Sequence, residues 1–540
     1  MTRPATGPSP RLAPQGMLAA AGLVAVVTLA ARAVGLVRWV VFSHAVGATC
    51  VGQVYATANQ VPNVLFEVAA GGALAAVAVP LVAGHLQRGD EHLADRTASA
   101  LMTWTLTVLL PLAVVVALAA GPVMGWLLGE SGRCAPGDAR DAGRLMLILF
   151  APQVVLYGVG IVLTGVLSAH RRFLAAATAP LVSSVLVIGV YLAFGALYDP
   201  ATPLASVPAA AVWLLAGGTT VGVVALSLPL LVPAGRLGIR WRPTWRFPAG
   251  TGRRAGALAL AGVLVVAAQQ LAAVVVLLLT NASTGVAGIT VWTYAQTTYL
   301  LPYAVLVVPL ATVAFPRLAG GGVDAVRVLR RALLGAVVAS VVAAVALVAL
   351  RDEVGRAFLL LDAGADGDGR VTLEALPLTV AALAPGLLGY ALLAVGTRAL
   401  YAVGSPRRAA AAGVAGWSVA ALVPVLVVAA GSPVHDTLLA LAVGSSLGMT
   451  VAGALVVLEV GRVWGPGTFE GLTRAGGAAM LGALLGLLVG EMALPPAADG
   501  WLPTVGRAAG RGVLVVLPAA LAVRLLAPRA WRGLAGRVRP

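Results

Sequence analysis

Long apolar runs, one after another along the whole chain, constrain this sequence more than any other feature. Each run is about as long as the ~20 residues that a helix needs to cross a bilayer. Soluble domains carry about 25% charged residues, whereas this chain of 540 residues carries 10%, too few to cover so much apolar surface. We therefore predict an all-α polytopic membrane protein with about fourteen transmembrane helices. The predicted spans are 17–46, 51–84, 98–129, 143–169, 173–198, 207–232, 255–281, 286–316, 328–350, 375–403, 409–431, 436–461, 471–494 and 508–527.

The basic residues test this map, because cytoplasmic loops of membrane proteins carry an excess of Lys and Arg. All 36 basic residues are arginine. If the N-terminus is cytoplasmic, 24 of them lie in inner loops and tails, seven in outer loops and five within spans. This bias predicts that both termini face the cytoplasm. The formal net charge of +16 then reflects topology, and no nucleic acid is expected as a partner.

A weak internal repeat indicates how the spans are grouped. Tyr55-Ala56, then Pro62 and Val79-Pro80, recurs as Tyr294-Ala295, then Pro302 and Phe315-Pro316. The offset equals six spans, and parallel repeats of six spans predict two similar lobes that face each other across a central cavity. The predicted organisation is a cytoplasmic leader (1–16), an N-lobe (17–232), a basic cytoplasmic linker (233–254), a C-lobe (255–461), two C-terminal spans (462–527) and a basic cytoplasmic tail (528–540).

The loops are too short to hold a soluble catalytic domain. The longest outer loop, from Leu350 to Ala375, has about 25 residues, too few for an independent core. The sequence shows no Ser/His/Asp set, P-loop or metal-spaced His or Cys, so we expect neither an enzyme nor a cofactor nor a metal site. Residues 364–375 resemble a calcium loop, but Gly364 and Ala375 occupy the first and twelfth ligand positions. This segment is predicted to be a flexible acidic outer loop.

The two cysteines, Cys50 and Cys134, both fall on predicted outer loops. The outside of the membrane is oxidising, so a disulfide is chemically permitted there. The sequence does not show whether the two Cα atoms come within the ~7 Å that a disulfide requires. Two free or buried thiols are the default interpretation, and a disulfide is the alternative.

Two arginines of the first span are the strongest candidates for function. Arg32 and Arg38 lie within an apolar run, where a charged side chain costs about 2.5–3.5 kcal/mol even on insertion scales. Each is therefore expected to face a partner or a water-filled cavity. Arg38 is nearer the outer end of the span, so its side chain has the alternative of extending to the membrane surface.

The second span carries a polar face. Gln60, Asn63 and Glu67 are spaced i, i+3 and i+7 and share one side of a helix, with Gln53 nearer its start. Glu67 is either the partner of an ion pair with one of the two arginines or a site for substrate or a coupling cation.

The eighth span presents a further polar cluster, for which we favour a cavity wall over hydrogen bonding between helices. The cluster is Tyr294, Gln296, Thr297, Thr298 and Tyr299. Three polar residues of the seventh span are interpreted as packing residues. They are Gln269, Gln270 and Asn281.

Several segments together resemble the MurJ/MviN family, the lipid II flippases of the multidrug/oligosaccharidyl-lipid/polysaccharide exporter superfamily. The opening signature is the most specific, and the likeness covers nearly the whole chain. The matching segments are Arg32-Ala-Val-Gly-Leu-Val-Arg38, Val46-Gly47-Ala48, Val61-Pro62-Asn63-Val64-Leu65, Gly71-Gly72-Ala73 with Val79-Pro80, 165–173 with Pro180, and Arg398-Ala-Leu-Tyr401-Ala402 with Pro406.

The resemblance implies a V-shaped, two-lobed flippase with a cationic central cavity. It implies that undecaprenyl-diphosphate-linked peptidoglycan precursor, or a related lipid-linked glycan, moves from the inner to the outer leaflet of the bacterial cytoplasmic membrane by alternating access. Cell-wall synthesis proteins are implied as further partners. Arg32 and Arg38 match the two arginines of the family's first span, and Arg398 matches its tenth-span segment.

This sequence also departs from the family pattern. Gln53 stands where the family typically has an aspartate, and Gln60 and Glu67 stand where it often has cations. Gln296 and Thr297 replace an acid–arginine pair. Two other functions therefore stay open: a drug or ion antiporter of the same superfamily, with Glu67 as the coupling carboxylate, and a non-transporting scaffold for cell-wall assembly.

Overall fold

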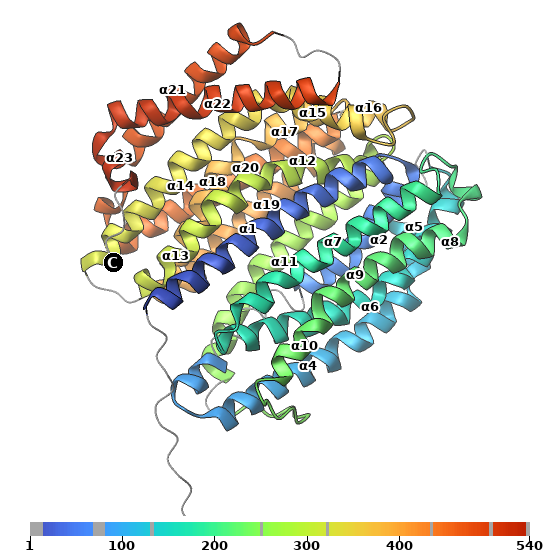
Figure 1. The fold of residues 1–540 in the computed structure, drawn as a ribbon, viewed down its shortest axis with the longest axis horizontal. Coiled ribbons are helices and arrows are strands. Elements are labelled where there is room, and N and C mark those ends of the chain that lie inside the picture. The colour runs from blue at the N-terminus through green and yellow to red at the C-terminus, as the bar shows by residue number, and fades with distance from the viewer. Residues whose placement is uncertain are drawn as a thin grey trace, which may run out of the picture.

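The computed structural model describes residues 14–68, 82–129, 134–248, 252–319, 323–431, 436–495 and 500–535. Every regular element in these residues is a helix, and most helices run along one common direction (Figure 1). This agrees with the all-α prediction. The predicted leader up to residue 13, the end of the tail from residue 536, and residues 69–81 of the second span lie outside the described residues.

The helices follow the predicted spans in order. The N-lobe contains α1 (Pro14–Ala45), α2 (Cys50–Phe66), α4 (Glu91–Leu118), α5 (Ala120–Leu128), α6 (Pro136–Ala169), α7 (Phe173–Leu197), α8 (Ala209–Val212), the π-helix η3 (Trp213–Gly217), α9 (Gly218–Ser227) and α10 (Leu231–Gly235). The C-lobe contains α11 (Gly252–Ser283), α12 (Gly288–Pro302), the π-helix η5 (Tyr303–Val307), α13 (Val308–Ala319), α14 (Val323–Ala349), α15 (Arg351–Leu361), α16 (Arg370–Leu373), α17 (Leu376–Leu383), α18 (Gly386–Ala402), α19 (Pro406–Ala429) and α20 (Asp436–Trp464). The chain ends with α21 (Leu472–Ala493), α22 (Trp501–Leu526) and α23 (Pro528–Ala535).

The described residues hold twelve helices that are long and apolar enough to cross a membrane, or thirteen if a bent pair counts as one span. The bent pair, 370–383 and 386–402, turns by 51° next to Pro385, which precedes α18. The remaining predicted span begins with α2 and continues beyond the described residues. The count of about fourteen is therefore consistent with the fold.

The packing of the helices repeats with an offset of six spans. In the N-lobe α1 packs against α7, α4 and α2 against α6, and α7 and α6 against α9. In the C-lobe α11 packs against α19, α14 and α12–α13 against α17–α18, and α19 and α18 against α20. Each C-lobe pair is the counterpart of one N-lobe pair, so the two lobes share one architecture. α21 and α22 pack on each other and on α14, outside the repeat (Figure 1).

The two segments that carry the sequence repeat are also alike in detail. Tyr55 on α2 and Tyr294 on α12 are both almost completely buried. Pro62 is followed by π-helical backbone at residues 67–68, and Pro302 is followed by the π-helix η5. A proline lacks the backbone N–H that an α-helix needs, and a π-bulge is one way in which a helix accommodates such a break.

The two ends of the bundle differ in how the lobes meet. We call the end with the turns at 46–50, 284–288 and 362–369 the Cys50 end, and the opposite one, with the turns at 88–90, 170–172 and 403–405, the Arg88 end. At the Cys50 end one apolar cluster includes residues of both lobes. Towards the Arg88 end the described apolar residues form separate clusters within each lobe. The lobes are thus joined at the Cys50 end.

Two segments that the sequence placed in loops or a tail are folded. The predicted outer loop from Leu350 to Ala375 contains α15, and its segment 364–375, predicted to be flexible, contains α16. The turn between these helices packs against Ala48 of the N-lobe: a Cβ on Gly364 would lie 2.3 Å from the Ala48 carbonyl oxygen. The predicted tail begins with α23. Both segments are polar by composition, so hydropathy alone assigned them to solvent.

Candidate functional site between the lobes

α1 lies between the lobes (Figure 1), and its two arginines have different neighbours. Arg38 is a neighbour of Tyr157 and Tyr191 of the N-lobe, whereas Arg32 is a neighbour of Tyr303 of the C-lobe. Arg32 is exposed and Arg38 is half-buried. The Nε atom of Arg38 is buried and has no hydrogen-bond partner in the described part of the chain. Both side chains therefore retain the capacity to bind an anion.

The third predicted arginine belongs to the same region. Arg398 on α18 is half-buried and is a neighbour of Tyr303, as Arg32 is. One Arg398 Nη1 donor is used within α18, at the carbonyl of Ala394 (2.9 Å). The Tyr303 ring stacks on Tyr390 with centroids 4.3 Å apart. The fold thus brings cations of spans 1 and 10 to one aromatic patch of the C-lobe.

The residues on the polar face of α2 differ in how far they are buried. Gln60 and Asn63 are half-buried and Glu67 is exposed, as is Gln296 on α12. No ion pair joins Glu67 to Arg32 or Arg38 among the described residues. The interpretation of Glu67 as the resting ion-pair partner of these arginines is therefore wrong for this conformation, and its carboxylate is accessible.

Gln53 lies in a different place from the other predicted site residues, because it is buried where the lobes meet. Its Nε2 donates to Asn281 Oδ1 (3.1 Å), and its Oε1 accepts the backbone N–H of Ala287 (2.9 Å). Asn281 Nδ2 in turn donates to Thr57 Oγ1 (3.1 Å). Asn281 is thus a packing residue, as the sequence predicts, and the helices it joins are α2 of the N-lobe and α11 of the C-lobe.

A second polar connection between the lobes centres on Asp362, which sequence reasoning missed. One carboxylate oxygen accepts the backbone N–H groups of Ala48 (2.6 Å) and Gly364 (2.8 Å). The other accepts the hydroxyls of Ser43 (2.6 Å) and Tyr294 (2.9 Å). We call these four bonds the Asp362 latch. Burial raises the pKa of this carboxyl above its ordinary value, and the hydrogen bonds oppose that rise.

The backbone is shaped to admit this carboxylate. Gly47, which follows α1, has φ +67°, and a Cβ there would lie 2.6 Å from Asp362 Oδ1. Thr49 then caps α2, with its hydroxyl accepting the N–H of Gly52 (3.1 Å). The sequence carries one signal for this arrangement. A glycine (Gly47), which tolerates a positive φ, stands shortly before an N-cap residue (Thr49), and an acid (Asp362) follows an apolar run.

Cys50 and Cys134 form a disulfide, which decides the question that the sequence left open. Their Cα atoms are 5.6 Å apart, and Cys134 is buried. The bond ties the first turn of α2 to the segment that leads into α6, within the N-lobe. The default interpretation of two free or buried thiols is therefore wrong, and the alternative, a disulfide, is confirmed.

An apolar groove of about 750 Å³ lies beside α1. It is bounded by α1, α12, α14, α15, α22 and α23, and none of the described residues that line it is charged. Leu36 and Val40 form its α1 wall, with Leu36 one turn after Arg32. The groove is therefore suited to a hydrocarbon chain, close to the arginines of the same helix.

A buried ion cluster holds α22 against the C-lobe. Arg511 donates to the Ala349 carbonyl (2.9 Å) and pairs with Glu353 (3.2 Å) and Glu491 (2.6 Å). Arg507 also pairs with Glu353 (3.3 Å). Removing one partner of such a buried cluster leaves an uncompensated charge. The cluster therefore positions α22, and with it one wall of the groove.

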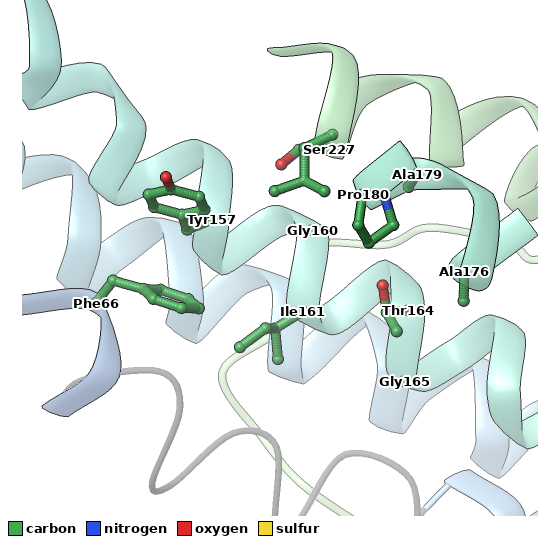
Figure 2. A pocket seen from close by; sticks show the side chains of 11 residues that line it. Phe66, Tyr157, Gly160, Ile161, Thr164, Gly165, Ala176, Ala179, Pro180 and Ser227 are labelled. Atoms are coloured by element: carbon green, nitrogen blue, oxygen red, sulfur yellow. The ribbon is translucent and has the colours of Figure 1, made fainter. Parts of the chain in front are cut away.

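The N-lobe also contains a smaller pocket of about 390 Å³ between α2, α6, α7 and α9. Figure 2 shows Tyr157 and Phe66 at one side of it and Pro180 and Thr164 at the other. Its lining is mostly apolar, and none of the eight predicted site residues belongs to it. This pocket is therefore separate from the arginines between the lobes.

Comparisons with known proteins agree with one another. The family model described as "Lipid II flippase MurJ" matches residues 42–480. A probable lipid II flippase MurJ of Rhizobium tropici is 27% identical over 359 residues, which are 64% of each chain. One from Synechocystis is 31% identical over 228 residues, 41% of this chain and 40% of that protein. The chain thus aligns with less than two thirds of these curated relatives' length.

Solved structures show the same fold. A lipid II flippase MurJ in an inward closed conformation superposes with a TM-score of 0.72 at 16% identity, covering 93% of this chain and 99% of that one. An inward-facing multidrug resistance MATE transporter reaches 0.60 at 16% identity, with 83% and 99% covered. Since the family model spans most of the sequence, this chain belongs to the lipid II flippase MurJ family.

Proposed function

We propose that this chain moves an undecaprenyl-diphosphate-linked peptidoglycan precursor, or a related lipid-linked glycan, between the leaflets of the bacterial cytoplasmic membrane. Its family is one of transporters rather than enzymes. The observation that carries the proposal is the placement of Arg32 and Arg38 on a helix between two lobes that are joined at the Cys50 end. Such a helix holds cations where cargo would pass.

The arginines suit the head group of this cargo. A diphosphate gives up strong hydration when it enters a protein, and the planar guanidinium replaces it with paired, charge-assisted hydrogen bonds. In the proposed site Arg32, Arg38 and Arg398 bind the diphosphate. Gln60, Asn63 and Gln296 offer hydrogen bonds to sugar and peptide groups. In this conformation the side chain of Gln53 is hydrogen-bonded to Asn281 and Ala287 of the other lobe, so it does not contact cargo.

The apolar groove suits the other part of the cargo. A long isoprenoid chain favours an apolar surface by about 25 cal/mol per Å² buried, and the groove lining in the described part of the chain carries no charged group. Because Leu36 and Arg32 lie one turn apart on α1, a single lipid can place its chain in the groove and its diphosphate between the lobes.

The orientation of the chain follows from its arginines in this proposal. The arginine-rich loops face the cytoplasm, which places both termini inside and the Cys50 end outside. The lobes are then joined on the outer side, and this conformation takes up cargo from the cytoplasm. Release on the outer side requires the contacts at the Cys50 end to separate, as in alternating access.

A second candidate function, a cation-coupled antiporter, is favoured by the state of Glu67. This carboxylate is exposed and makes no ion pair with Arg32 or Arg38 in the described structure, so it is free to bind a cation. If it is a coupling site, Glu67→Gln stops turnover and leaves cargo binding intact. If it serves only to neutralise an arginine, the same change tightens cargo binding.

The test is complementation of a flippase-depleted strain, combined with a leaflet assay for lipid II in the same cells. Rescue with lipid II reaching the outer leaflet is the expected result. Rescue without movement of lipid II would indicate a scaffold. No rescue, together with cation-dependent drug export, would indicate the antiporter.

A further inference from the structure

A cavity lined by arginine lies at the Arg88 end, away from the site between the lobes. Its volume is about 880 Å³. Six arginines and one glutamate line it, and they come from the starts of α14 and α21 and from α23. They are Arg327, Arg330, Arg331, Arg474, Arg529, Arg532 and Glu470. Side chains from three helices, far apart in the sequence, therefore converge on one space.

The positive charge of this cavity is only partly compensated. Arg330 pairs with Glu470 (2.8 Å), and Arg327 pairs with Asp324 (2.7 Å). These ion pairs are exposed, and such pairs contribute little to stability. Arg331 and Arg529 are exposed and have no bonded partner among the described residues.

The remaining arginines are held in place by backbone groups. Arg474 Nε donates to the Leu526 carbonyl at the end of α22 (2.6 Å), and Arg532 Nε donates to Pro528 (3.3 Å). Gly471 and Thr473 at the start of α21 also line the cavity. The first N–H groups of a helix lack partners within it and attract anions. The cavity therefore combines guanidinium groups with a helix N-terminus.

The cavity and the apolar groove lie on two faces of α23. Trp531 and Leu534 line the groove, whereas Arg529 and Arg532 line the cavity, each pair at a spacing of three residues. α14 contributes to both, with Leu334 in the cavity and Val338 in the groove. α23 packs on α14 and α22 at the edge of the bundle (Figure 1).

We propose that the arginine cavity binds the phosphate head group of a lipid whose hydrocarbon chain lies in the apolar groove. Arginines that serve only to orient a membrane protein need only lie on the cytoplasmic side. The arginines of this cavity instead converge on one space that borders the apolar groove. Basic pockets between membrane helices on the cytoplasmic side bind phosphate head groups. This role rests on the proposed function: the cavity would receive the diphosphate of the cargo before the diphosphate moves to Arg32 and Arg38. The other source of such a head group is a bilayer phospholipid.

The test measures lipid binding to the full-length protein in detergent by native mass spectrometry. The probes are undecaprenyl diphosphate, phosphatidylglycerol and inorganic pyrophosphate. The variant is Arg331→Gln with Arg529→Gln, which breaks no bond among the described residues. The control is Arg407→Gln with Arg408→Gln, which removes the same charge at the same end, outside the cavity. Leu534→Gln changes only the groove.

We expect the cavity variant to weaken undecaprenyl diphosphate binding at least about tenfold, the scale of one charged hydrogen bond, with less than about twofold change in the control. Leu534→Gln should weaken binding of the lipid and not of pyrophosphate. Equal losses for phosphatidylglycerol would support the site and assign it to bilayer lipid. Equal binding by the cavity variant and the control would overturn the proposal. Wild-type protein that binds phosphatidylglycerol through these arginines, but no undecaprenyl diphosphate, would contradict the proposed function and leave the site standing.

Discussion

The Cys50 end and the Arg88 end of this protein differ in how the lobes are held. At the Cys50 end, side chains from both lobes share one apolar cluster, and two polar connections, the Asp362 latch and the Gln53–Asn281 contact, cross between them. At the Arg88 end the described apolar clusters stay within their lobes, and arginines gather. One end is bonded and the other is charged.

This difference indicates where the energy of the conformational change lies. Separating the lobes at the Cys50 end exposes apolar surface and breaks hydrogen bonds, each of which contributes about 0.5–1.5 kcal/mol net. Among the described residues, no comparable set of hydrogen bonds joins the two lobes at the Arg88 end. If cargo binds between the lobes as proposed, its binding must offset the cost of opening the Cys50 end. Four predictions test this comparison.

The largest expected effect concerns Arg32 and Arg38, the arginines proposed to receive the cargo. Arg32→Ala together with Arg38→Ala should reduce transport at least about a hundredfold, because two charged contacts to a diphosphate are lost. Membrane insertion should be normal. Arg→Lys at either position should restore transport only in part, since an ammonium does not reproduce the planar fork.

A leaflet assay at matched expression checks this prediction, with Arg407→Ala as the control. Full transport by the double variant would leave a scaffold as the better account of the protein.

The next effect concerns the latch. Asp362→Ala removes the acceptor of four hydrogen bonds and should shift the population towards a structure open at the Cys50 end. Asp362→Asn should remain mostly closed, because the hydroxyls of Ser43 and Tyr294 can accept its amide hydrogens. Spin labels at Ala205 and Asp366, which line one pocket from the two lobes, would report the separation.

Asp368→Ala is the matched control for the latch, since it removes an exposed acid from the same turn. Equal distance distributions in Asp362→Ala and the control would show that the apolar cluster alone closes this end.

The third effect separates rigidity within a lobe from contact between lobes. Cys50→Ser with Cys134→Ser opens a cross-link that closes a long loop, which typically lowers stability by about 2–4 kcal/mol. Because the disulfide joins two parts of the N-lobe, the distances across the Cys50 end should not change. Thermal unfolding in detergent, with and without reductant, measures the first quantity, and the spin labels measure the second. A large increase in separation would mean that the disulfide belongs to the latch.

The smallest effect is a dependence on external pH. Burial raises the pKa of Asp362 in the closed state, so the closed state binds this proton more tightly than an open state with an exposed carboxyl. The closed population should therefore rise as the pH falls through the raised pKa and stop rising near the ordinary value of about 4.

The groups that face this carboxyl determine the controls for the pH experiment. Tyr294 donates to it, and His44 contacts the adjacent Leu361 carbonyl (3.3 Å). The acids Asp366 and Asp368 lie in the same turn. Asp362→Asn should abolish the dependence, and His44→Gln should retain it. A dependence that survives in Asp362→Asn would have another source.

The apolar pattern of the sequence determined the helices and their order, because hydropathy is a local property that each span carries by itself. The helices begin and end within several residues of the predicted spans. The repeat around Tyr55 and Tyr294 correctly predicted that the two lobes pack in the same way. The cost of burying charge in an apolar helix likewise singled out Arg32 and Arg38 as candidates, and their role stays a prediction for the transport assay.

Only the tertiary structure decided which distant groups meet. The pairing of Cys50 with Cys134, the contact of Gln53 with Asn281 and three of the four bonds to Asp362 join residues 68 to 319 positions apart. Their identities as cysteine, amide or acid admit many partners. The choice among them depends on which helix faces pack together. A span hydrophobic on all sides does not state which face that is, so these contacts emerge only when the lobes are assembled.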